Sequence, residues 1–221
     1  EFLIELDKLG ISLTEVQESQ LEKYYQLLVQ YNEHMNLTGI TEHGEVYLKH
    51  FYDSLTLIKA IHLEKVQTLC DVGTGAGFPG IVLKIVFPKI QVTLLDSLNK
   101  RIEFLKVVIQ ELHLTDIEAI HTRAEEYAMT HREQFDVSLL SEMSLPVVKL
   151  NGYFIPMKGH LEMETEDLSD IVHFLGGRLD EIITFELPIE QSTRTLIKIK
   201  KVMYTNKKYP RKFSEMKKRP L

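Results

Sequence analysis

Residues 68–80 have the sequence TLCDVGTGAGFPG, in which a short apolar run leads into closely spaced glycines. Residues 67–72 are typical of a buried strand, and residues 79–87 of a short helix. Glycines between the two permit a tight turn with positive φ and let a ligand approach the bare backbone. Pro79 suits the first turn of a helix, where its missing N–H is not needed. The stretch therefore predicts a strand–loop–helix unit that binds a ligand.

The same alternation continues toward the C-terminus. Further strands are predicted at residues 91–95, 117–121, 134–137 and 152–157, with helices at 99–112 and 124–130. The β-rich segments 179–187 and 193–202 predict a terminal hairpin. Repeated strand–helix units imply a parallel sheet with helices on both faces. We expect an α/β, Rossmann-type fold with a mostly parallel, seven-stranded sheet and a C-terminal antiparallel hairpin.

The chain divides into three predicted parts: a helical extension at 1–63, the α/β core at 64–202 and a basic tail at 203–221. In the extension, Ser12 and Glu15 have the spacing of a capping box. Apolar residues from Leu21 to Met35 recur at helical spacing, and a second helix is expected from about residue 46 to 61.

Charge is unevenly distributed along the 221 residues. The net charge is −6, yet residues 198–221 hold ten basic residues against Glu215 alone. A basic segment on an acidic body is typical of a polyanionic partner such as nucleic acid, although a solvated tail is an equal alternative. The single cysteine, Cys70, lies in a predicted strand and is interpreted as a core residue. The histidines and the cysteine do not have the spacing of metal ligands, so we expect no metal site. No apolar run is long enough to span a membrane, and we expect a soluble, cytoplasmic protein and favour a monomer.

Three carboxylates lie at or just after the ends of predicted strands near the glycine loop. Asp71 precedes the loop, where its charge would oppose a pyrophosphate but suits the ammonium and sulfonium of S-adenosylmethionine. Asp96 ends the next strand and is placed to accept hydrogen bonds from a ribose diol. Glu125, after the third strand, is placed to receive an adenine amino group. These positions favour S-adenosylmethionine as the cofactor.

A dinucleotide enzyme is the alternative, because residues 75–80 formally match G-x-G-x-x-G. In the register set by Gly73, which directly follows the strand, the third glycine position is occupied by Phe78. That register argues against an NAD oxidoreductase.

The combination of motifs resembles a bacterial family, the small-subunit rRNA guanine-N7 methyltransferases, also called glucose-inhibited division protein B. The resemblance rests on CDVGTGAGFPG at 70–80, DSLNKR at 96–101 and RAE at 123–125, and it extends to 31–38, 49–54, 187–188, Arg194 and 207–212. It implies a Rossmann methyltransferase that modifies N7 of one guanine in the 16S rRNA of the small ribosomal subunit. The predicted cofactor-binding residues are Asp71, Gly73, Gly75, Gly77, Phe78, Asp96, Ala124 and Glu125.

Two segments depart from the family pattern. The family has an arginine-containing T-A-R-A stretch after the fourth strand, whereas here Val137 runs directly into Ser138. We interpret this as a mobile loop missing from the chain, or as a real deletion that would put activity in doubt. The family's G-T-P turn after the basic motif is replaced by residues 213–216.

Guanine N7 carries a lone pair and no proton, so methylation there needs no general base, and no catalytic acid or base is predicted. Asn36, His50 and Tyr52 are candidates to contact the guanine. In the tail, lysine and arginine side chains are expected to neutralise RNA phosphates and a tyrosine to stack on a base; these residues are Lys207, Lys208, Tyr209, Arg211 and Lys212. The alternatives are a methyltransferase of protein or metabolite, and a non-enzymatic RNA-binding assembly factor with a vestigial cofactor pocket.

Overall fold

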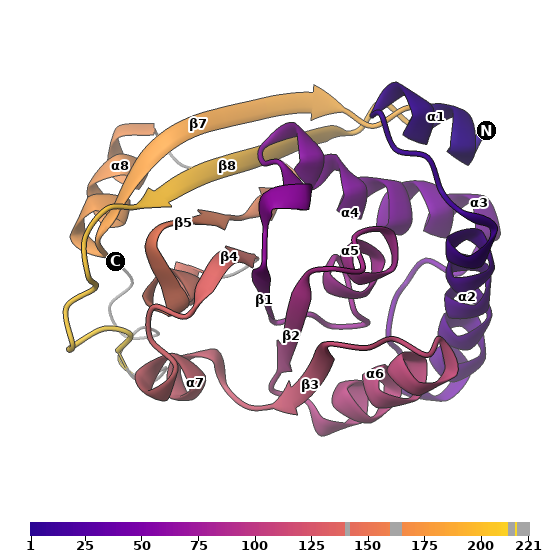
Figure 1. Cartoon of the computed structure of the whole chain (residues 1–221), viewed down its shortest axis with the longest axis horizontal. Coiled ribbons are helices and arrows are strands. Elements are labelled where there is room, and N and C mark those ends of the chain that lie inside the picture. The colour runs from indigo at the N-terminus through magenta and orange to yellow at the C-terminus, as the bar shows by residue number, and fades with distance from the viewer. Residues whose placement is uncertain (140–141, 160–164, 212–214, 216–221) are drawn as a thin grey trace.

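In the computed structural model, which describes residues 1–139, 142–159, 165–211 and 215, a central sheet is covered by helices on both faces (Figure 1). The strands are β1 (Thr68–Val72), β2 (Gln91–Asp96), β3 (Ile117–His121), β4 (Phe135–Leu139), β5 (Val148–Ile155), β6 (Met157–Lys158), β7 (Gly177–Glu186) and β8 (Thr193–Lys201). The helices between them are α5 (Gly80–Val86), α6 (Asn99–Glu111), α7 (Ala124–Thr130), the 3₁₀ turn η4 (Glu142–Val147) and α8 (Thr165–Phe174).

The order β3-β2-β1-β4-β5-β8 runs across the sheet, with β7 paired to the outer side of β8. Strands β1 to β5 pair in parallel, while β8 runs antiparallel to β5 and β7. The predicted α/β fold and terminal hairpin are confirmed. The sheet has eight strands rather than seven because Pro156, which lacks an N–H, separates β5 from β6, and both pair with β8.

The N-terminal region holds α1 (Phe2–Lys8), α2 (Glu15–Met35) and α3 (His43–Val46). The predicted capping box at Ser12 and Glu15 is wrong: the box is formed by Thr14 and Gln17, each accepting a hydrogen bond from the other's backbone N–H.

The single helix predicted over residues 46–61 is also wrong. The segment consists of the π-helical turn η1 (Tyr47–Tyr52), α4 (Asp53–Leu55) and the 3₁₀ turn η2 (Thr56–Lys59), with a further 3₁₀ turn η3 (Leu63–Lys65) before β1. Hydroxyl groups compete for the helical carbonyls here, since Ser54 donates to the carbonyl of His50 and Thr56 to that of Asp53, both at 2.5 Å. Wide π turns of this kind often occur at functional sites.

Alternate residues of β1 face opposite sides of the sheet. Leu69 belongs to the largest apolar cluster, which also contains residues of α2, α5 and α6. Cys70 is buried in a smaller cluster with Tyr127 and Ala128 of α7, as expected of a core cysteine, and burial raises the pKa of its thiol. Among the described residues, no helix combines the length and apolarity needed to cross a bilayer.

Candidate functional site

The glycine loop lies between the carboxyl end of β1 and the start of α5. Gly73, Gly75 and Gly77 have φ values of 74°, 61° and 104°, which confirms the predicted turn with positive φ. The N–H groups of Gly73 and Thr74 donate to the carbonyl of Leu95 at 2.8 and 3.0 Å, fixing the loop to β2. A Cβ atom on Gly73 or Gly75 would meet nothing within 4 Å, so this part of the backbone faces open space.

Asp71 supports the loop from beneath. Its carboxylate is fully buried and accepts hydrogen bonds from the Thr74 hydroxyl at 2.7 Å and the Gly80 N–H at 2.9 Å. Burial raises the pKa of Asp71 to about 7. The structure thus gives Asp71 a supporting position, whereas the sequence predicts direct contact with an ammonium group.

Asp96 joins the loop to the next strand end. One carboxylate oxygen accepts from the N–H of Gly75 at 2.9 Å and from Arg101 at 3.3 Å, while the other accepts from the N–H of Leu98 at 2.9 Å. The loop conformation therefore depends on this carboxylate. Arg101 is a site residue that the sequence reasoning missed; its place five residues after Asp96, at the start of α6, was the available signal.

Beside the loop is a cleft of about 180 Å³ at the carboxyl ends of β1, β2 and β3. Parallel sheets place ligands at this edge. Four of the predicted cofactor-binding residues meet there: Gly73, Asp96, Ala124 and Glu125. The rest of the lining consists of Val72, Leu95, Ser97, Thr122, Arg123 and Met143. Glu125 lies in the first turn of α7 with its side chain largely buried.

Phe78, at the far end of the loop, packs against the N-terminal region. Its ring stacks on His50 of η1, with centroids 4.4 Å apart and planes 12° apart. Tyr24 of α2 lies 5.4 Å from the Phe78 ring, and its hydroxyl donates to the carbonyl of Ala76 at 2.6 Å. Tyr24 was not among the predicted site residues, although it lies in the predicted helix.

His50 should make stability depend on pH. Burial lowers the pKa of its imidazole from 6.5 to about 4. Between these values the unfolded chain binds the extra proton, so this histidine lowers stability as the pH falls from 6.5, by up to about 1.4 kcal/mol per unit. We expect His50→Phe, which retains a ring against Phe78, to lose less stability between pH 7 and pH 5 than the parent chain. Urea unfolding at both pH values measures this, and an identical pH dependence of the two proteins would contradict it.

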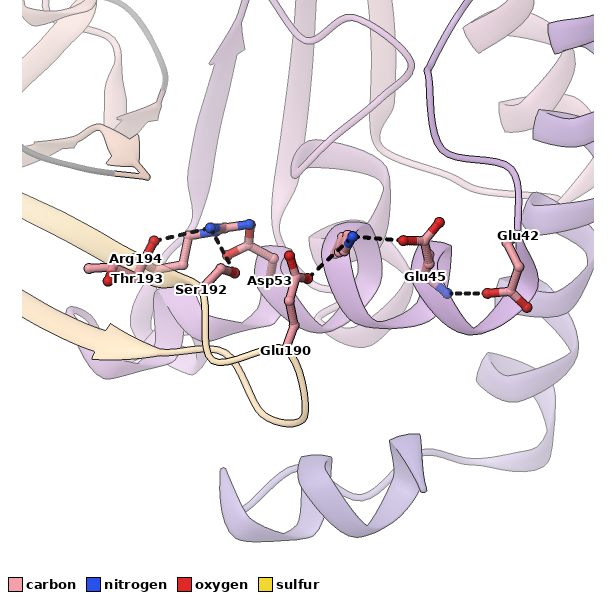
Figure 2. Close-up of polar contacts among 8 residues, drawn as sticks. Glu42, Glu45, Asp53, Glu190, Ser192, Thr193 and Arg194 are labelled. Atoms are coloured by element: carbon pink, nitrogen blue, oxygen red, sulfur yellow. Dashed lines mark hydrogen bonds and ion pairs between the residues drawn. The ribbon is translucent and has the colours of Figure 1, made fainter.

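Turn η1, which carries His50, and the start of α4 after it are tied to the hairpin by ion pairs (Figure 2). Arg194 of β8 donates to the Asp53 carboxylate at 2.8 Å, and Lys49 lies 3.4 Å from Glu190 in the connection between β7 and β8. Of the three guanine candidates, His50 is the one whose ring stacks on the glycine loop, at Phe78. Asn36 caps α2 in a left-handed conformation, and Tyr52 is buried beside α1.

The C-terminal segment after β8 is anchored as far as it is described. Arg132 donates to the carbonyls of Thr205 and Tyr209, both at 2.7 Å. The ring of Tyr209 is buried and packs edge-on against Phe174, so it is not the exposed stacking surface predicted. Lys207 and Lys208 are exposed and Arg211 is partly buried, whereas Lys212 lies outside the described residues.

Comparisons with known proteins agree with this geometry. The family model for rRNA small subunit methyltransferase G matches residues 17–193. Ribosomal RNA small subunit methyltransferase G of Lachnoclostridium phytofermentans is 49% identical over all of this chain and 96% of its own, and that of Bacillus subtilis is 45% identical over all of this chain and 98% of its own.

Among solved structures, a SAM-dependent methyltransferase from Aquifex aeolicus superposes with a TM-score of 0.55 at 16% identity, covering 73% of this chain and 94% of that one. An N1-methyltransferase for 1,6-didemethyltoxoflavin from Burkholderia thailandensis, solved with S-adenosylhomocysteine bound, has the same TM-score at 12% identity, covering 87% and 92%. These two show the fold.

The comparisons also bear on the short connection after β4. The two alignments run over 232 and 233 positions against the 221 residues of this chain, so the relatives contain residues that it lacks. Strand β4 continues through Val137 to Leu139 without a break. The lengths of the alignments do not place these residues along the chain, so the missing mobile loop and the real deletion both stay predictions for this connection. With a family model matched over most of its length and relatives near half identity over all of it, the chain belongs to the family of rRNA small subunit methyltransferase G.

Proposed function

We propose that this protein transfers the methyl group of S-adenosylmethionine to N7 of a guanine in small-subunit rRNA, as a soluble cytoplasmic enzyme. The observation that carries the proposal is the open backbone of Gly73 and Gly75 beside a cleft lined by Asp96 and Glu125. The rRNA substrate is taken from the names of the relatives.

The residues present fit an adenosine with a cationic sulfur. The cleft is smaller than the roughly 300–1,000 Å³ of a whole ligand site, so it suits the nucleoside, with the remainder over the glycine loop. Asp96 borders the space for a ribose, and Glu125 with the first N–H groups of α7 borders the space for the adenine. S-adenosylmethionine, when bound, supplies an electrophilic methyl group.

The chain's own contribution to the reaction is positioning. Guanine N7 needs no deprotonation, so no residue has to remove a proton. Correct orientation of two reactants can account for about 7–11 kcal/mol of a barrier. We expect Phe78, in ring contact with His50 and Tyr24, to fix the loop against which the two reactants meet.

Methyl transfer is tested with unmodified small ribosomal subunits and with free rRNA, using S-adenosylmethionine labelled in the methyl group. We expect label in the RNA, and chain cleavage specific for N7-methylguanine at one position. Absence of label from both substrates would refute the proposal.

A second candidate is a non-enzymatic assembly factor that retains the pocket, and the direct run from Val137 into Ser138, without the family's arginine-containing stretch, favours it. Calorimetric titration decides between the two. Binding of S-adenosylmethionine without turnover on either RNA substrate would support the assembly factor. Heat from NAD with none from S-adenosylmethionine would instead point to the dinucleotide reading.

A further inference from the structure

A second hollow, of about 480 Å³, lies at the opposite edge of the sheet from the glycine loop. Its lining includes Lys65 and Val66, just before β1, and Asp136 at the start of β4. Because β1 has five residues at about 3.3 Å each, roughly 16 Å of strand separates this hollow from the loop. It is thus distinct from the site proposed for methyl transfer.

Basic side chains from two segments far apart in sequence, residues 59–65 and Lys198, converge on the hollow. We call it the basic groove and define it by Lys59, His62, Lys65, Asn151, Tyr153 and Lys198. In the part of the chain that the structure describes, no carboxylate lies within ion-pair distance of Lys59, Lys65 or Lys198. In a chain with net charge −6, three such lysines on one surface indicate an external anion.

Two carboxylates also border the groove. Asp136 is already occupied, since it pairs with Lys149 and accepts from the N–H groups of Gln67 and Thr68 at 2.9 and 2.8 Å. Glu181 is exposed and stands opposite Lys198 across the β7–β8 pairing. Counting Lys149, four lysines face two carboxylates, and the surface keeps a positive balance.

The ring contacts indicate which part of a nucleic acid fits. The Lys198 ammonium lies 4.8 Å from the centre of the Tyr153 ring, and that of Lys59 lies 5.2 Å from the centre of the Phe185 ring. With Lys198 over its ring, Tyr153 does not offer that face to a base. The groove therefore suits phosphates rather than bases, and ammonium groups bind phosphates as point charges.

We propose that the basic groove binds the phosphate backbone of the RNA substrate, without sequence preference, while the glycine-loop edge of the sheet acts on the guanine. The proposal rests on the proposed function for the identity of the anion. Contacts at two edges of the sheet would orient a folded RNA on the protein, which a single contact at the reacting base does not achieve.

The test replaces Lys59, Lys65 and Lys198 by glutamine together, and Lys65 alone because it has no ring contact. RNA binding is measured by fluorescence anisotropy from 50 to 300 mM salt, with an rRNA fragment and with a homopolymer RNA. For the triple variant we expect binding about tenfold weaker near 0.1 M salt, and a log–log salt slope shallower by about 2. Lys65→Gln should lower the slope by up to about 1, and the affinity for S-adenosylmethionine should not change.

The matched control replaces Lys8, Lys23 and Lys106 by glutamine, which changes the net charge by the same amount. These lysines lie in ion pairs with Glu5, Glu111 and Glu103, respectively. Equal loss of binding in this control, or an unchanged slope in the groove variants, would overturn the proposal. So would normal binding to free RNA combined with weaker binding to whole subunits, which would indicate a protein partner. A wild-type chain that binds homopolymer RNA through the groove but transfers no methyl group would contradict the proposed function and leave the groove standing.

Discussion

Gly77→Ala should lower the free energy of unfolding by about 2–5 kcal/mol and remove measurable cofactor binding. Gly77 has a φ of 104°, and a Cβ atom there would lie 2.6 Å from the Tyr24 hydroxyl, 2.7 Å from Ile81 and 2.9 Å from Leu105. Tyr24 cannot move aside cheaply, because its hydroxyl is bonded to Ala76 and its ring stacks on Phe51 at 5.5 Å. The methyl group would therefore displace the loop or α2.

Gly10→Ala is the matched control for this prediction. Gly10 also has a positive φ, of 75°, but a Cβ atom there would meet nothing within 4 Å. It should lose only the backbone strain, about 1–2 kcal/mol. Urea unfolding of both variants separates strain from packing. Equal losses of unfolding free energy in the two variants would show that the clash with Tyr24 adds nothing to the cost of Gly77→Ala.

The repetitive part of the fold could be predicted because each element has its own local signal. The predicted bounds of β3 and α7 match the structure, those of β2 and α6 differ by one residue at one end, and those of α5 differ by one residue at each end. Helix α8 was missed although its sequence carries such a signal. Within and just after this helix, which follows the undescribed residues 160–164, apolar residues recur at helical spacing; they are Leu168, Ile171, Val172 and Leu175.

The sequence predicts which loop and which carboxylates form the candidate site, but it does not predict the side chains that hold the loop in place. Strand ends followed by acids bring Asp96 and Glu125 together at one edge, because parallel strands end on the same side. Nothing in the spacing of Tyr24 or His50 shows that α2 and η1 pack on the glycine loop, since that contact is tertiary. Nor does the sequence distinguish a carboxylate above the loop from one below it, which is why Asp71 was expected to face a ligand.

Asp96→Asn should weaken S-adenosylmethionine binding about 100-fold. Hydrogen bonds to a charged group contribute about 1.5–3 kcal/mol each, and 1.4 kcal/mol corresponds to a factor of ten. The carboxylate accepts from the N–H groups of Gly75 and Leu98 and from Arg101. An amide of the same shape turns an NH₂ group toward at least one of these donors, and the loop loses the contact that orients Gly75. Calorimetric titration measures the loss, with Asp170→Asn on the exposed surface of α8 as the control of equal charge change.

The kinetic form of this loss distinguishes positioning from chemistry. Asp96 holds the loop that would carry the cofactor, and N7 methylation requires no proton transfer, so its removal should act before the reacting atoms meet. The KM for S-adenosylmethionine should rise with the dissociation constant, while kcat at saturating cofactor should fall much less. A kcat lowered 100-fold with an unchanged KM would instead show that Asp96 stabilises the transition state. That result would be inconsistent with a carboxylate whose two oxygens accept hydrogen bonds from the glycine loop and from the start of α6. Measuring KM and kcat therefore tests the geometry of the site as well as the role of Asp96.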